Sequence, residues 1–448
     1  MARGKKKESA LTPEEKLAQA LVPDWEQPYR VPGNWCWTTL GSLVDTSKEK
    51  TEDFSDPDVK YVGLEHLEKD TGIIGSASAE GVKSLKNVFH PGQILYGKLR
   101  PYLNKHDVAD FDGVCSTDIL VFNVRKTAIA QYVDFFLNQR SFIEYAVTNS
   151  KGINLPRVSE GTVLDAVCPL PPLAEQQRIV DRIEYLFAKL DEAKEKAQSV
   201  LDSFETRKAA ILHKAFTGEL TAKWRAEHGV HFAPNNYSLI EVFNFIDYRG
   251  MTPDKTDSGI PLITAKNIKK GYIDYRISEY ISPETYLQRL GRGIARRNDL
   301  LITTEAPLGN VALADQDTYS TAQRVIVLQL REEYRDKVNN KYVMHYMLDE
   351  SFQTKLQDQK TGSTVAGIKA AKLKLIPIVL PCVTEQAEVV RILDSLFAKE
   401  QQAKDAAEAV LEKIDLLKKS ILARAFRGEL GTNDPSEESA LELLKSVL

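Results

Sequence analysis

The sequence of 448 residues has few cysteines and no long apolar run. Its four cysteines, Cys36, Cys115, Cys168 and Cys382, show no paired spacing, which is typical of a reducing compartment and argues against a zinc site. The N-terminus lacks the apolar core of a signal peptide, and no run reaches membrane-spanning length. We therefore expect a soluble, cytoplasmic protein without a membrane partner.

The sequence also lacks the motifs that carry common nucleotide-dependent chemistry. It has no phosphate-binding loop of the P-loop type, and its proline-rich stretch at 169–172 has no aromatic residue of the kind found in methyltransferase motifs. His228 and His231 form an HxxH pair, for which a polar linker is preferred over a metal pair. Cys115 is preferred as a packed strand residue over a nucleophile. The sequence predicts no catalytic residue and no metal site, so we expect the chain not to be an enzyme.

What the sequence does have is a long internal repeat. Residues 170–220 and 380–430 align without a gap at an offset of 210 residues and share 22 of 51 positions. Both copies contain the letters EQ near the start, LFAK in the middle and GEL at the end. A period of this length indicates a duplicated domain pair rather than a solenoid.

Each repeated segment has the pattern of a long coiled-coil helix. Apolar residues recur at alternating spacings of three and four for more than four heptads, although Arg207 and Glu400 interrupt the pattern. Pro171 and Pro381 precede the predicted helices, and Gly218 and Gly428 follow them. A helix of roughly 40 residues would span about 60 Å. The residues predicted to pair the helices are Ile179, Ile183, Leu186, Leu190, Val200, Phe204, Val389, Leu393, Leu396, Val410, Ile414 and Leu417.

Two such helices in one chain can pair with each other, because the segment between them can fold back. We predict an intramolecular antiparallel coiled coil, whose small residues Ala193, Ala197, Ala403 and Ala407 allow close approach. Two alternatives remain open: ordinary core helices in separate domains, or helices that dimerise between chains.

The segments between the helices are predicted to be mixed globular domains. Short β-like runs are separated by turn residues, and both segments become helical near their ends at the same 210-residue offset. The predicted organisation is an N-terminal arm with a short helix (1–30), a first globular domain (31–169), a first long helix and linker (170–225), a second globular domain (226–379), and a second long helix with a C-terminal tail (380–448).

In the arm, Thr12 to Glu15 form a capping box with proline at the first helical position, which predicts a helix over 13–22. Lys5, Lys6 and Lys7 could contact phosphate, but a solvated tail is the preferred interpretation.

Positive charge gathers in two places, although the net charge of the chain is −4. Residues 81–110 and 261–300 are both locally basic and contain tyrosines. Cations among polar and aromatic neighbours suit a phosphate backbone and base edges, although a solvated basic face is an equal alternative. The candidates for DNA contact are Lys83, Lys86, Lys98, Arg100, Lys105, Lys266, Asn267, Lys269, Lys270, Arg289, Arg292, Arg296 and Arg297.

Several motifs together resemble those of one family. They are PLPPLAEQQ at 169–177, LPCVTEQ at 380–386, the GELT and KWR ends within 218–225, and VPGNWCWTTLGSLV at 31–44. In the second half, the stretches at 259–274, 298–310 and 321–330 look like the domain signatures of the same family. The chain resembles the DNA-specificity subunit of type I restriction–modification systems over nearly all of its length beyond residue 30.

The resemblance implies an α+β fold in which two similar target-recognition domains are joined by the antiparallel helix pair. Each domain would recognise one half of a split, asymmetric double-stranded DNA site, and the helices would set the spacer between the halves. Family members also bind two methyltransferase subunits and, for cleavage, motor–nuclease subunits. S-adenosylmethionine, ATP and Mg²⁺ would be bound by those partners, and no cofactor by this chain.

The chain departs locally from the family pattern, and, as a separate matter, one other class of function would fit the same repeat. Cys382 and Val383 replace the second proline and the leucine of the first copy, a departure that concerns local packing. A structural adaptor that holds two protein partners through its duplicated domains would have the same symmetry. Charge reversal at Arg292 or Lys270 should abolish DNA binding in a DNA-recognition protein and leave assembly intact in an adaptor.

Overall fold

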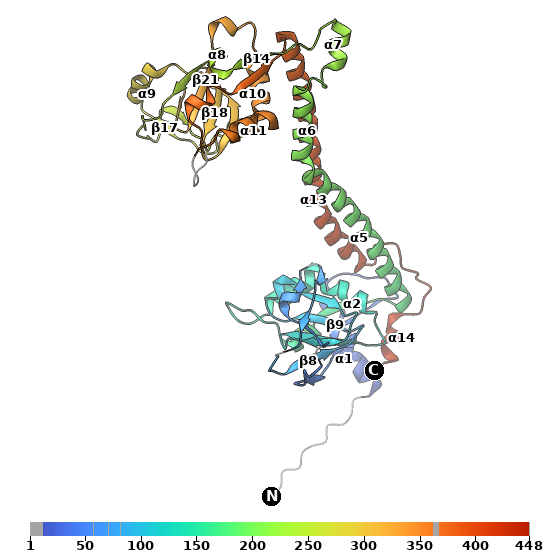
Figure 1. The fold of residues 1–448 in the computed structure, drawn as a ribbon. Coiled ribbons are helices and arrows are strands. Elements are labelled where there is room, and N and C mark those ends of the chain that lie inside the picture. The colour runs from blue at the N-terminus through green and yellow to red at the C-terminus, as the bar shows by residue number, and fades with distance from the viewer. Residues whose placement is uncertain (1–11, 57, 70, 81, 362–366, 448) are drawn as a thin grey trace. The chain divides into compact units, whose positions relative to one another are not determined.

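The computed structural model describes residues 12–447, apart from 57, 70, 81 and 362–366. The chain forms two compact units (Figure 1). The first unit combines the N-terminal part of the chain up to Ala197 with the C-terminal part from Ala409, and the second is Gln198–Glu408. Each unit contains a globular part and a stretch in which two long helical segments pack together. The predicted α+β architecture, with an intramolecular antiparallel helix pair, is confirmed.

The arm begins with the predicted capping box, which starts helix α1 (Pro13–Ala20). The Thr12 hydroxyl accepts a hydrogen bond from the Glu15 N–H at 3.2 Å, and the Glu15 carboxylate accepts one from the Thr12 N–H at 2.8 Å. The helix ends at Ala20, before the predicted residue 22, because Leu21 is extended. Leu21 forms a bridge with Thr38, and the Val22 N–H donates to the Trp37 carbonyl. Lys5, Lys6 and Lys7 lie outside the described residues.

The globular part of the first unit contains two main sheets. One has the strand order β10–β9–β12–β2 and the other β3–β8–β11–β4–β7, in which β11 and β4 are parallel. Two small pairs, β1–β13 and β5–β6, complete it. The strands are β1 (Cys36–Thr39), β2 (Val44–Thr46), β3 (Lys50–Thr51), β4 (Lys60–Val62), β5 (Leu67–Glu68), β6 (Gly72–Ile73), β7 (Ala77–Ser78), β8 (Lys86–Phe89), β9 (Ile94–Gly97), β10 (His106–Val108), β11 (Gly113–Cys115), β12 (Ile119–Val124) and β13 (Val167–Leu170).

The second unit repeats the four-stranded sheet in the order β15–β21–β18–β19, but its other sheet has only the three strands β17–β16–β20. The pair β14–β22 matches β1–β13. The strands are β14 (Asn235–Ser238), β15 (Phe243–Asp247), β16 (Ile260–Ile263), β17 (Tyr280–Ile281), β18 (Leu300–Thr304), β19 (Leu308–Leu313), β20 (Ser320–Thr321), β21 (Val325–Leu330) and β22 (Pro377–Leu380).

Helices cover the four-stranded sheet of each unit at the 210-residue offset. In the first unit, helix α2 (Ala130–Leu137) packs through a single face. The buried residues of this face recur one turn apart: Tyr132, Val133, Phe136 and Leu137. The matching helices are α2 (Ala130–Leu137) with α10 (Asn340–Leu348), α3 (Arg140–Thr148) with α11 (Glu350–Asp358), and α4 (Glu160–Leu164) with α12 (Ala370–Leu373). The remaining short helices are α7 (Ala222–His228), α8 (Leu239–Val242), α9 (Pro283–Arg289) and α14 (Ala440–Lys445).

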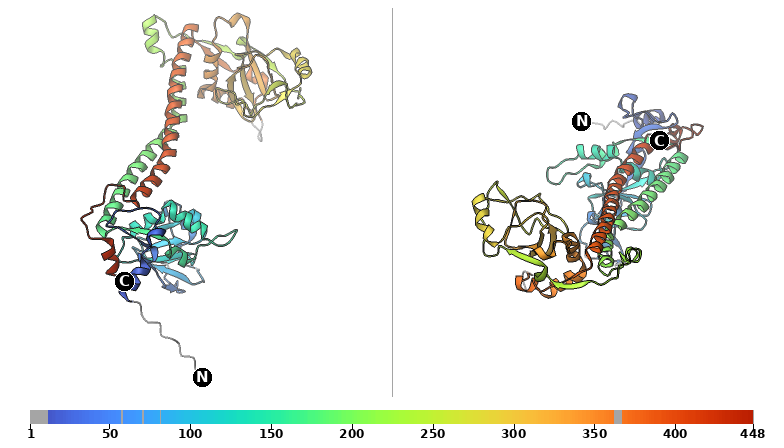
Figure 2. Two further views of the ribbon diagram at one scale, coloured as in Figure 1. Left: turned by 180° about the vertical axis from the view of Figure 1, so that it is seen from behind. Right: turned by 90° about the horizontal axis from the view of Figure 1, so that it is seen from above.

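The two predicted long helices differ in continuity. The second is one helix, α13 (Val383–Ala425), whereas the first is divided into α5 (Leu173–Asp202) and α6 (Phe204–Phe216), which both run alongside α13 (Figure 2). The division falls at Ser203, whose hydroxyl donates to the Ser199 carbonyl at 2.6 Å. Such back-bonding competes with the helix ladder. Lys413 stands at the equivalent position of α13 and cannot compete in this way.

The seam between the helices differs in part from the prediction. Ile179, Ile183, Val389, Leu393 and Ile414 are buried as predicted. Val410 and Leu417, however, are 40% and 48% exposed, so the prediction that they pair the helices is wrong. Leu411 and Lys418 are the half-buried residues in their place. Spacings of three and four suit either of two neighbouring stripes on a helix, and α13 buries the stripe that contains Leu411 and Lys418. The other predicted positions, Leu186, Leu190, Leu396, Val200 and Phe204, are half-buried.

The two residues that interrupt the heptad pattern form an ion pair with each other. The Arg207 guanidinium donates to the Glu400 carboxylate at 2.8 Å, and both side chains are partly buried. Two cation–ring contacts, related by the repeat, lie along the same seam: Lys208 is 5.4 Å from the centre of the Phe397 ring, and Lys418 is 5.0 Å from that of Phe187. The helices therefore pair through charged as well as apolar side chains.

The repeated GEL motif ends each long helix with a glycine that no other residue could replace without strain. Gly218 and Gly428 have φ values of +82° and +72°. A Cβ atom would lie 2.8 Å from the Phe232 ring at the first and 2.4 Å from Pro32 at the second. Both the backbone conformation and the close approach explain why each copy of the motif has glycine at this position.

Candidate nucleic-acid interface

The EQ motif fixes the start of each long helix to its own globular part. The Gln176 side chain accepts from the Ile129 N–H at 3.0 Å and donates to the Thr127 carbonyl at 2.9 Å. Gln386 makes the same bonds to Asn339 (2.8 Å) and Lys337 (2.9 Å). Both glutamines are fully buried. The globular part of each unit is thus bonded through a buried glutamine to the helix that follows it.

The glutamate of the motif binds the segment that follows the other long helix. Glu385 accepts from Thr221 at 2.7 Å and from Arg225 at 2.6 Å, both just after α6. Glu175 accepts from Thr432 at 2.6 Å, after α13, and from Arg178 at 2.8 Å. Burial raises the pKa of Glu175, against the lowering effect of these two bonds.

Each four-stranded sheet has one end at which several loops converge, which we call the loop end. In the first unit, the loop end lies where β9 ends and its antiparallel neighbour β12 begins. Leu99 pairs with Arg157, the Arg100 N–H donates to the Pro156 carbonyl at 2.7 Å, and Lys151 pairs with Arg157. Arg157 forms an ion pair with Asp118 at 3.2 Å. The loop at 150–157 is thereby joined to the loop after β9.

Five cations lie at this loop end, and most of them are exposed. The five cations are Lys48, Lys98, Arg100, Lys151 and Arg157, and the two carboxylates beside them are Asp118 and Glu160. Two aliphatic residues lie between Lys151 and Arg157 in the sequence: Ile153 is 99% exposed and Leu155 is 45% exposed. An aliphatic side chain that is fully exposed between cations suits contact with a partner more than packing within the unit.

The second unit has an equivalent loop end with different side chains. Glu305 pairs with Gly367, and the Ile368 N–H donates to the Thr304 carbonyl at 2.9 Å, as in the first unit. Arg324, which like Asp118 comes just before its strand, forms an ion pair with Glu305 at 2.7 Å. The residue before the strand is thus acidic in the first unit and basic in the second, and its partner is Arg157 of the 150–157 loop in the first and Glu305, just after β18, in the second. The loops surround a polar groove of about 380 Å³, lined by Arg249, Thr304, Glu305, Gln323, Thr361, Gly367, Ile368 and Lys369.

The basic region predicted over 261–300 does not form one surface. Arg296 and Arg297 precede β18, whereas the loop end follows it, so they lie at the opposite end of the sheet. Arg297 is paired there with Asp317 at 2.9 Å. Arg292 lies near the Asp247 carboxylate at the end of β15. Sequence alone joined these cations because they are close in the chain.

Two of the predicted DNA-contacting residues are structural, and their prediction is corrected. Arg289 is 2% exposed; its guanidinium donates to Ser320 at 3.0 Å and to the Thr321 carbonyl at 2.7 Å, and lies over the Tyr248 ring. Asn267 is 3% exposed. A buried guanidinium and a buried amide need such partners, so neither side chain is free to reach DNA.

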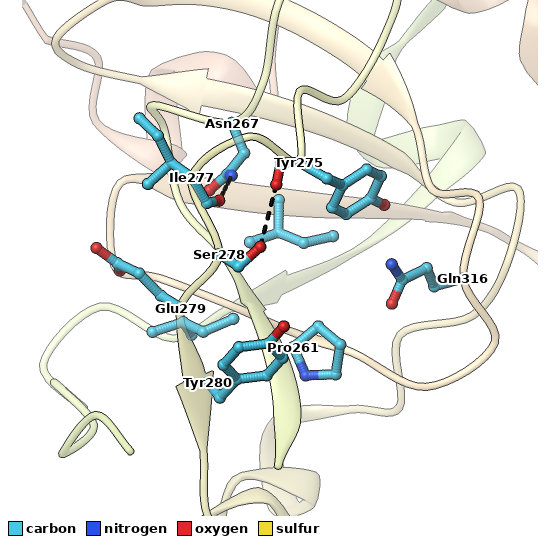
Figure 3. Close-up of a pocket in the computed structure, with 10 residues that line it drawn as sticks. Pro261, Asn267, Tyr275, Ile277, Ser278, Glu279, Tyr280 and Gln316 are labelled. Atoms are coloured by element: carbon cyan, nitrogen blue, oxygen red, sulfur yellow. Dashed lines mark hydrogen bonds between the residues drawn. The ribbon is translucent and has the colours of Figure 1, made fainter. Parts of the chain in front are cut away.

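Figure 3 shows why Asn267 is buried. Its amide turns inward and donates to the Ile277 carbonyl at 2.7 Å, while its oxygen accepts from the Thr264 N–H at 2.9 Å. The pocket beside it, about 50 Å³ and flanked by Tyr275 and Tyr280, is too small for a nucleotide base. Asn267 therefore closes a turn, as His66 does in the first unit by accepting from the Gly63 N–H at 3.0 Å.

The other candidate cations are at the surface or partly so, in several places. Lys98 and Arg100 are at the first loop end. Lys266 and Lys270 are exposed on a turn whose Gly271 N–H donates to Val311 of β19 at 2.8 Å, and Lys269 is half-buried there. In the first unit Lys83 is exposed, Lys86 lies over the Tyr61 ring, and Lys105 donates to the Leu64 carbonyl at 2.5 Å.

The comparison with known families agrees with the repeated architecture. The family described as "Type I restriction modification DNA specificity domain" matches residues 32–201 and again 235–412. These two matches cover most of the chain and coincide with the duplicated globular parts and their helices. The chain belongs to this family.

Individual members of the family are similar to the chain over part of their length. The EcoDI specificity subunit of Escherichia coli is 32% identical over 50% of this chain and 51% of its own length. The EcoBI specificity subunit of E. coli is 29% identical over 63% and 62%. The chain thus spans about half the length of the first of these relatives and about three-fifths of the second.

Solved structures of the family share the fold. The HsdS subunit from Thermoanaerobacter tengcongensis superposes with a TM-score of 0.66 at 21% identity, covering 90% of this chain and all of that one. A chain from a structure titled for complex assembly and conformational transition of the type I R–M system gives 0.67 at the same identity and coverage.

The remaining predictions concern sites outside the loop ends. Among the described residues, no three His, Cys, Asp or Glu side chains are grouped so that they could hold a metal ion. His228 stacks on Trp224 and bonds its carbonyl at 2.8 Å, and Cys115 is buried in β11. None of the helices in the described part of the chain is both long and apolar enough to cross a membrane.

Sequence reasoning missed the cations that the fold brings to the loop ends. Lys151 and Arg157 are far in the chain from Lys98, and Arg249, Arg324 and Lys369 lie outside the basic segment 261–300. Local charge counts cannot find residues that only strand pairing brings together. A usable signal was present in the repeat: the bridged residues Lys151 and Arg157 correspond to Thr361 and Gly367 at the same offset as the helices.

Proposed function

We propose that this chain is the DNA-recognition subunit of a type I restriction–modification complex, in which each loop end contacts one half of a split DNA site. The observation that supports this most directly is the pair of equivalent loop ends. They have the same backbone pairing and different exposed side chains, with Arg157–Asp118 in one and Arg324–Glu305 in the other. A constant frame with variable side chains suits recognition of two different sequences.

The side chains of each loop end suit the two kinds of contact that DNA recognition needs. Exposed lysines and arginines neutralise phosphates without regard to sequence, whereas hydrogen-bonding and apolar groups contact base edges. In the first unit, Arg100 and Lys151 would contact phosphate and the exposed Ile153 would enter a groove. In the second, Gln323 and Arg249 line the polar groove, where an amide or guanidinium can bond a purine edge.

The paired helices would set the distance between the two half-sites and bind two methyltransferase subunits. Half-sites separated by a helical turn of DNA, roughly 34 Å, require a rigid connection of that order. In systems that cut DNA, two motor–nuclease subunits would join the complex. S-adenosylmethionine, ATP and Mg²⁺ would be bound by these partners, and catalysis would be theirs.

The decisive experiment is methylome sequencing of cells that express this chain with its methyltransferase subunit, compared with cells that lack this chain. We expect a split motif with modified adenines that is lost when the chain is absent. If no motif depends on the chain while the methyltransferase is active with a different specificity chain, the adaptor function is favoured instead.

The spacer role has a test of its own. Deleting one heptad from the α5–α6 segment and the matching heptad from α13 should change the spacer and leave both half-sites as they were. A change in half-site preference with an unchanged spacer would contradict the proposal.

A further inference from the structure

The edge of the small strand pair in the first unit is covered by the N-terminal arm. The Val22 N–H donates to the Trp37 carbonyl of β1 at 3.0 Å, and the Thr38 hydroxyl donates to the Ala20 carbonyl at 2.7 Å. Leu21 and Thr38 form a bridge. As a result, Trp37 and Thr38 are 3% and 0% exposed.

The equivalent edge in the second unit is open. Strand β14 pairs with β22 in the register that β1 has with β13, so Asn236 corresponds to Trp37 and Tyr237 to Thr38. Residues of an antiparallel strand bond alternately to either side, and the Trp37 carbonyl faces the arm. The backbone N–H and C=O of Asn236 therefore face away from β22. Within the described residues no bridge or backbone bond meets this edge, and Asn236 is exposed.

A cleft of about 210 Å³ lies beside the open edge. Val338, Leu380 and Val383 contribute apolar lining, and Val383 is 41% exposed. In the first unit, Ala128 and Leu170 occupy the positions of Val338 and Leu380, and they belong to the apolar cluster that includes Ala20. The full lining is Asn235, Tyr237, Tyr334, Asp336, Lys337, Val338, Leu380, Pro381, Cys382 and Val383.

We propose that the β14 edge and this cleft bind a segment of the methyltransferase subunit. The segment would take the form of residues 17–22: a turn of aliphatic helix, a small residue over Tyr237, and an extended residue that bonds the backbone of Asn236. The chemistry of the occupant follows from the arm, which covers the same edge of the same fold in the first unit. Strand addition of this kind gains its affinity from main-chain bonds and its selectivity from the adjoining pocket. The choice of the methyltransferase as partner rests on the proposed function.

Asn236 allows a test in which only the backbone donor is removed. Asn236→Pro deletes the outward N–H, which no bond within the chain uses, and proline is tolerated on such an edge. Asn236→Ala removes the same side chain and keeps the N–H, so it is the matched control. Equal melting temperatures of the two variants would show that both fold.

Cys382 reports on occupancy, because it is exposed and lines the cleft. Cys115 and Cys168 are buried, and burial raises the pKa of Cys36 to about 12, so these thiols react slowly with alkylating reagents. We expect assembly with the methyltransferase subunit to slow alkylation of Cys382 by at least about tenfold in the natural chain and in Asn236→Ala. In Asn236→Pro we expect weaker assembly, by about tenfold, and fast alkylation.

The possible outcomes separate the site from the function. Assembly with unchanged Cys382 reactivity, or equal affinity of Asn236→Pro and Asn236→Ala, would overturn the inference and leave the proposed function intact. Failure of the natural chain to bind the methyltransferase subunit at all would overturn both.

Discussion

The two units share the four-stranded sheet and its attachment to a long helix, and they differ in the second sheet and in the loop ends. In both, a four-stranded sheet in the same order is covered by two helices at a fixed offset, and a buried glutamine ties the sheet to a long helix. The second sheets have five and three strands, and the loop ends carry different charges. A duplicated molecule can therefore vary what it contacts without altering how it is held together.

The largest expected effect comes from reversing the charge of one loop end and leaving the other unchanged. Lys151→Glu with Arg157→Glu should weaken binding of the split site on the order of 1000-fold, about 4 kcal/mol, because several phosphate and base contacts of one half are lost. Binding to DNA that contains only the half recognised by the second unit should be unchanged. Fluorescence anisotropy on both DNAs measures this.

A matched control lies at the opposite end of a sheet. Arg297→Glu reverses an exposed charge of the second unit away from its loop end, and it should change affinity for either DNA less than threefold. If Arg297→Glu abolishes binding and the double variant does not, the loop ends are not the interface.

The glutamates of the two EQ motifs should differ in importance. Glu385→Ala leaves Arg225, whose side chain is 13% exposed, without its carboxylate, and we expect a loss of about 3 kcal/mol in the free energy of unfolding of the second unit. Glu175→Ala should cost about 1 kcal/mol in the first unit, because Arg178 keeps Glu437 at 2.7 Å. Calorimetry, with hydrogen exchange to assign each transition, tests the order; equal losses would contradict it.

The second unit should also be the more sensitive to acid. Burial lowers the pKa of His345 to about 4, with the nearby cations Lys341 and Lys208 adding to this and Asp394 opposing it. The folded pKa lies below the unfolded value, so the neutral ring stabilises the unit above about pH 6.5, and this contribution is lost as the pH falls toward 4. The loss should reach about 2 kcal/mol at pH 5.

The first unit supplies the control for this effect. Phe135 occupies the equivalent position, and its ring centre lies 6.0 Å from that of Phe187. The ring centre of His345 lies 5.7 Å from that of Phe397 in the same way. His345→Phe should therefore remove the pH dependence that the histidine causes. The difference in unfolding free energy between the two proteins, measured from pH 7 to pH 5, isolates His345 from Asp299, whose pKa burial raises to about 6.

The smallest expected effect concerns the ion pair in the seam. Because Arg207 and Glu400 are 34% and 21% exposed, solvent screening leaves a coupling of about 1 kcal/mol. Each single change to leucine should destabilise the helix pair, and the double change should restore or exceed the natural stability. A double-mutant cycle by urea unfolding measures the coupling, and additive single effects would show that the pair contributes nothing.

Much of the fold could be predicted because periodic and local patterns of the amino-acid sequence determine it. The heptads, the capping box at Thr12 and the helix-ending Gly218 and Gly428 are local signals that the structure confirms. The seam at Val410 and Leu417 was wrong because a heptad pattern fixes the face of a helix only to within one stripe. The break at Ser203 depends on one side-chain bond, which no periodicity reports.

The candidate site was less predictable, because it is made by strand pairing over long sequence distances. Lys98 and Arg100 were found from local charge, whereas Arg157 and Arg324 reach the loop ends only through the sheet. Arg289 and Asn267 were misassigned because composition does not distinguish a cation or amide at the surface from one that bonds buried carbonyls.

The Arg207–Glu400 pair has a consequence for which helices can recognise each other. The 210-residue repeat places Leu190 at the position equivalent to Glu400, and Leu417 at that equivalent to Arg207. If the first helical segments of two separate chains paired with each other, each Arg207 would face Leu190; if two α13 helices did, each Glu400 would lose its arginine partner. Either mismatch would leave two partly buried charges without a counter-ion. One ion pair, present in only one half of a duplicated seam, thus favours pairing of the first helical segment with α13 over pairing of either segment with its own copy.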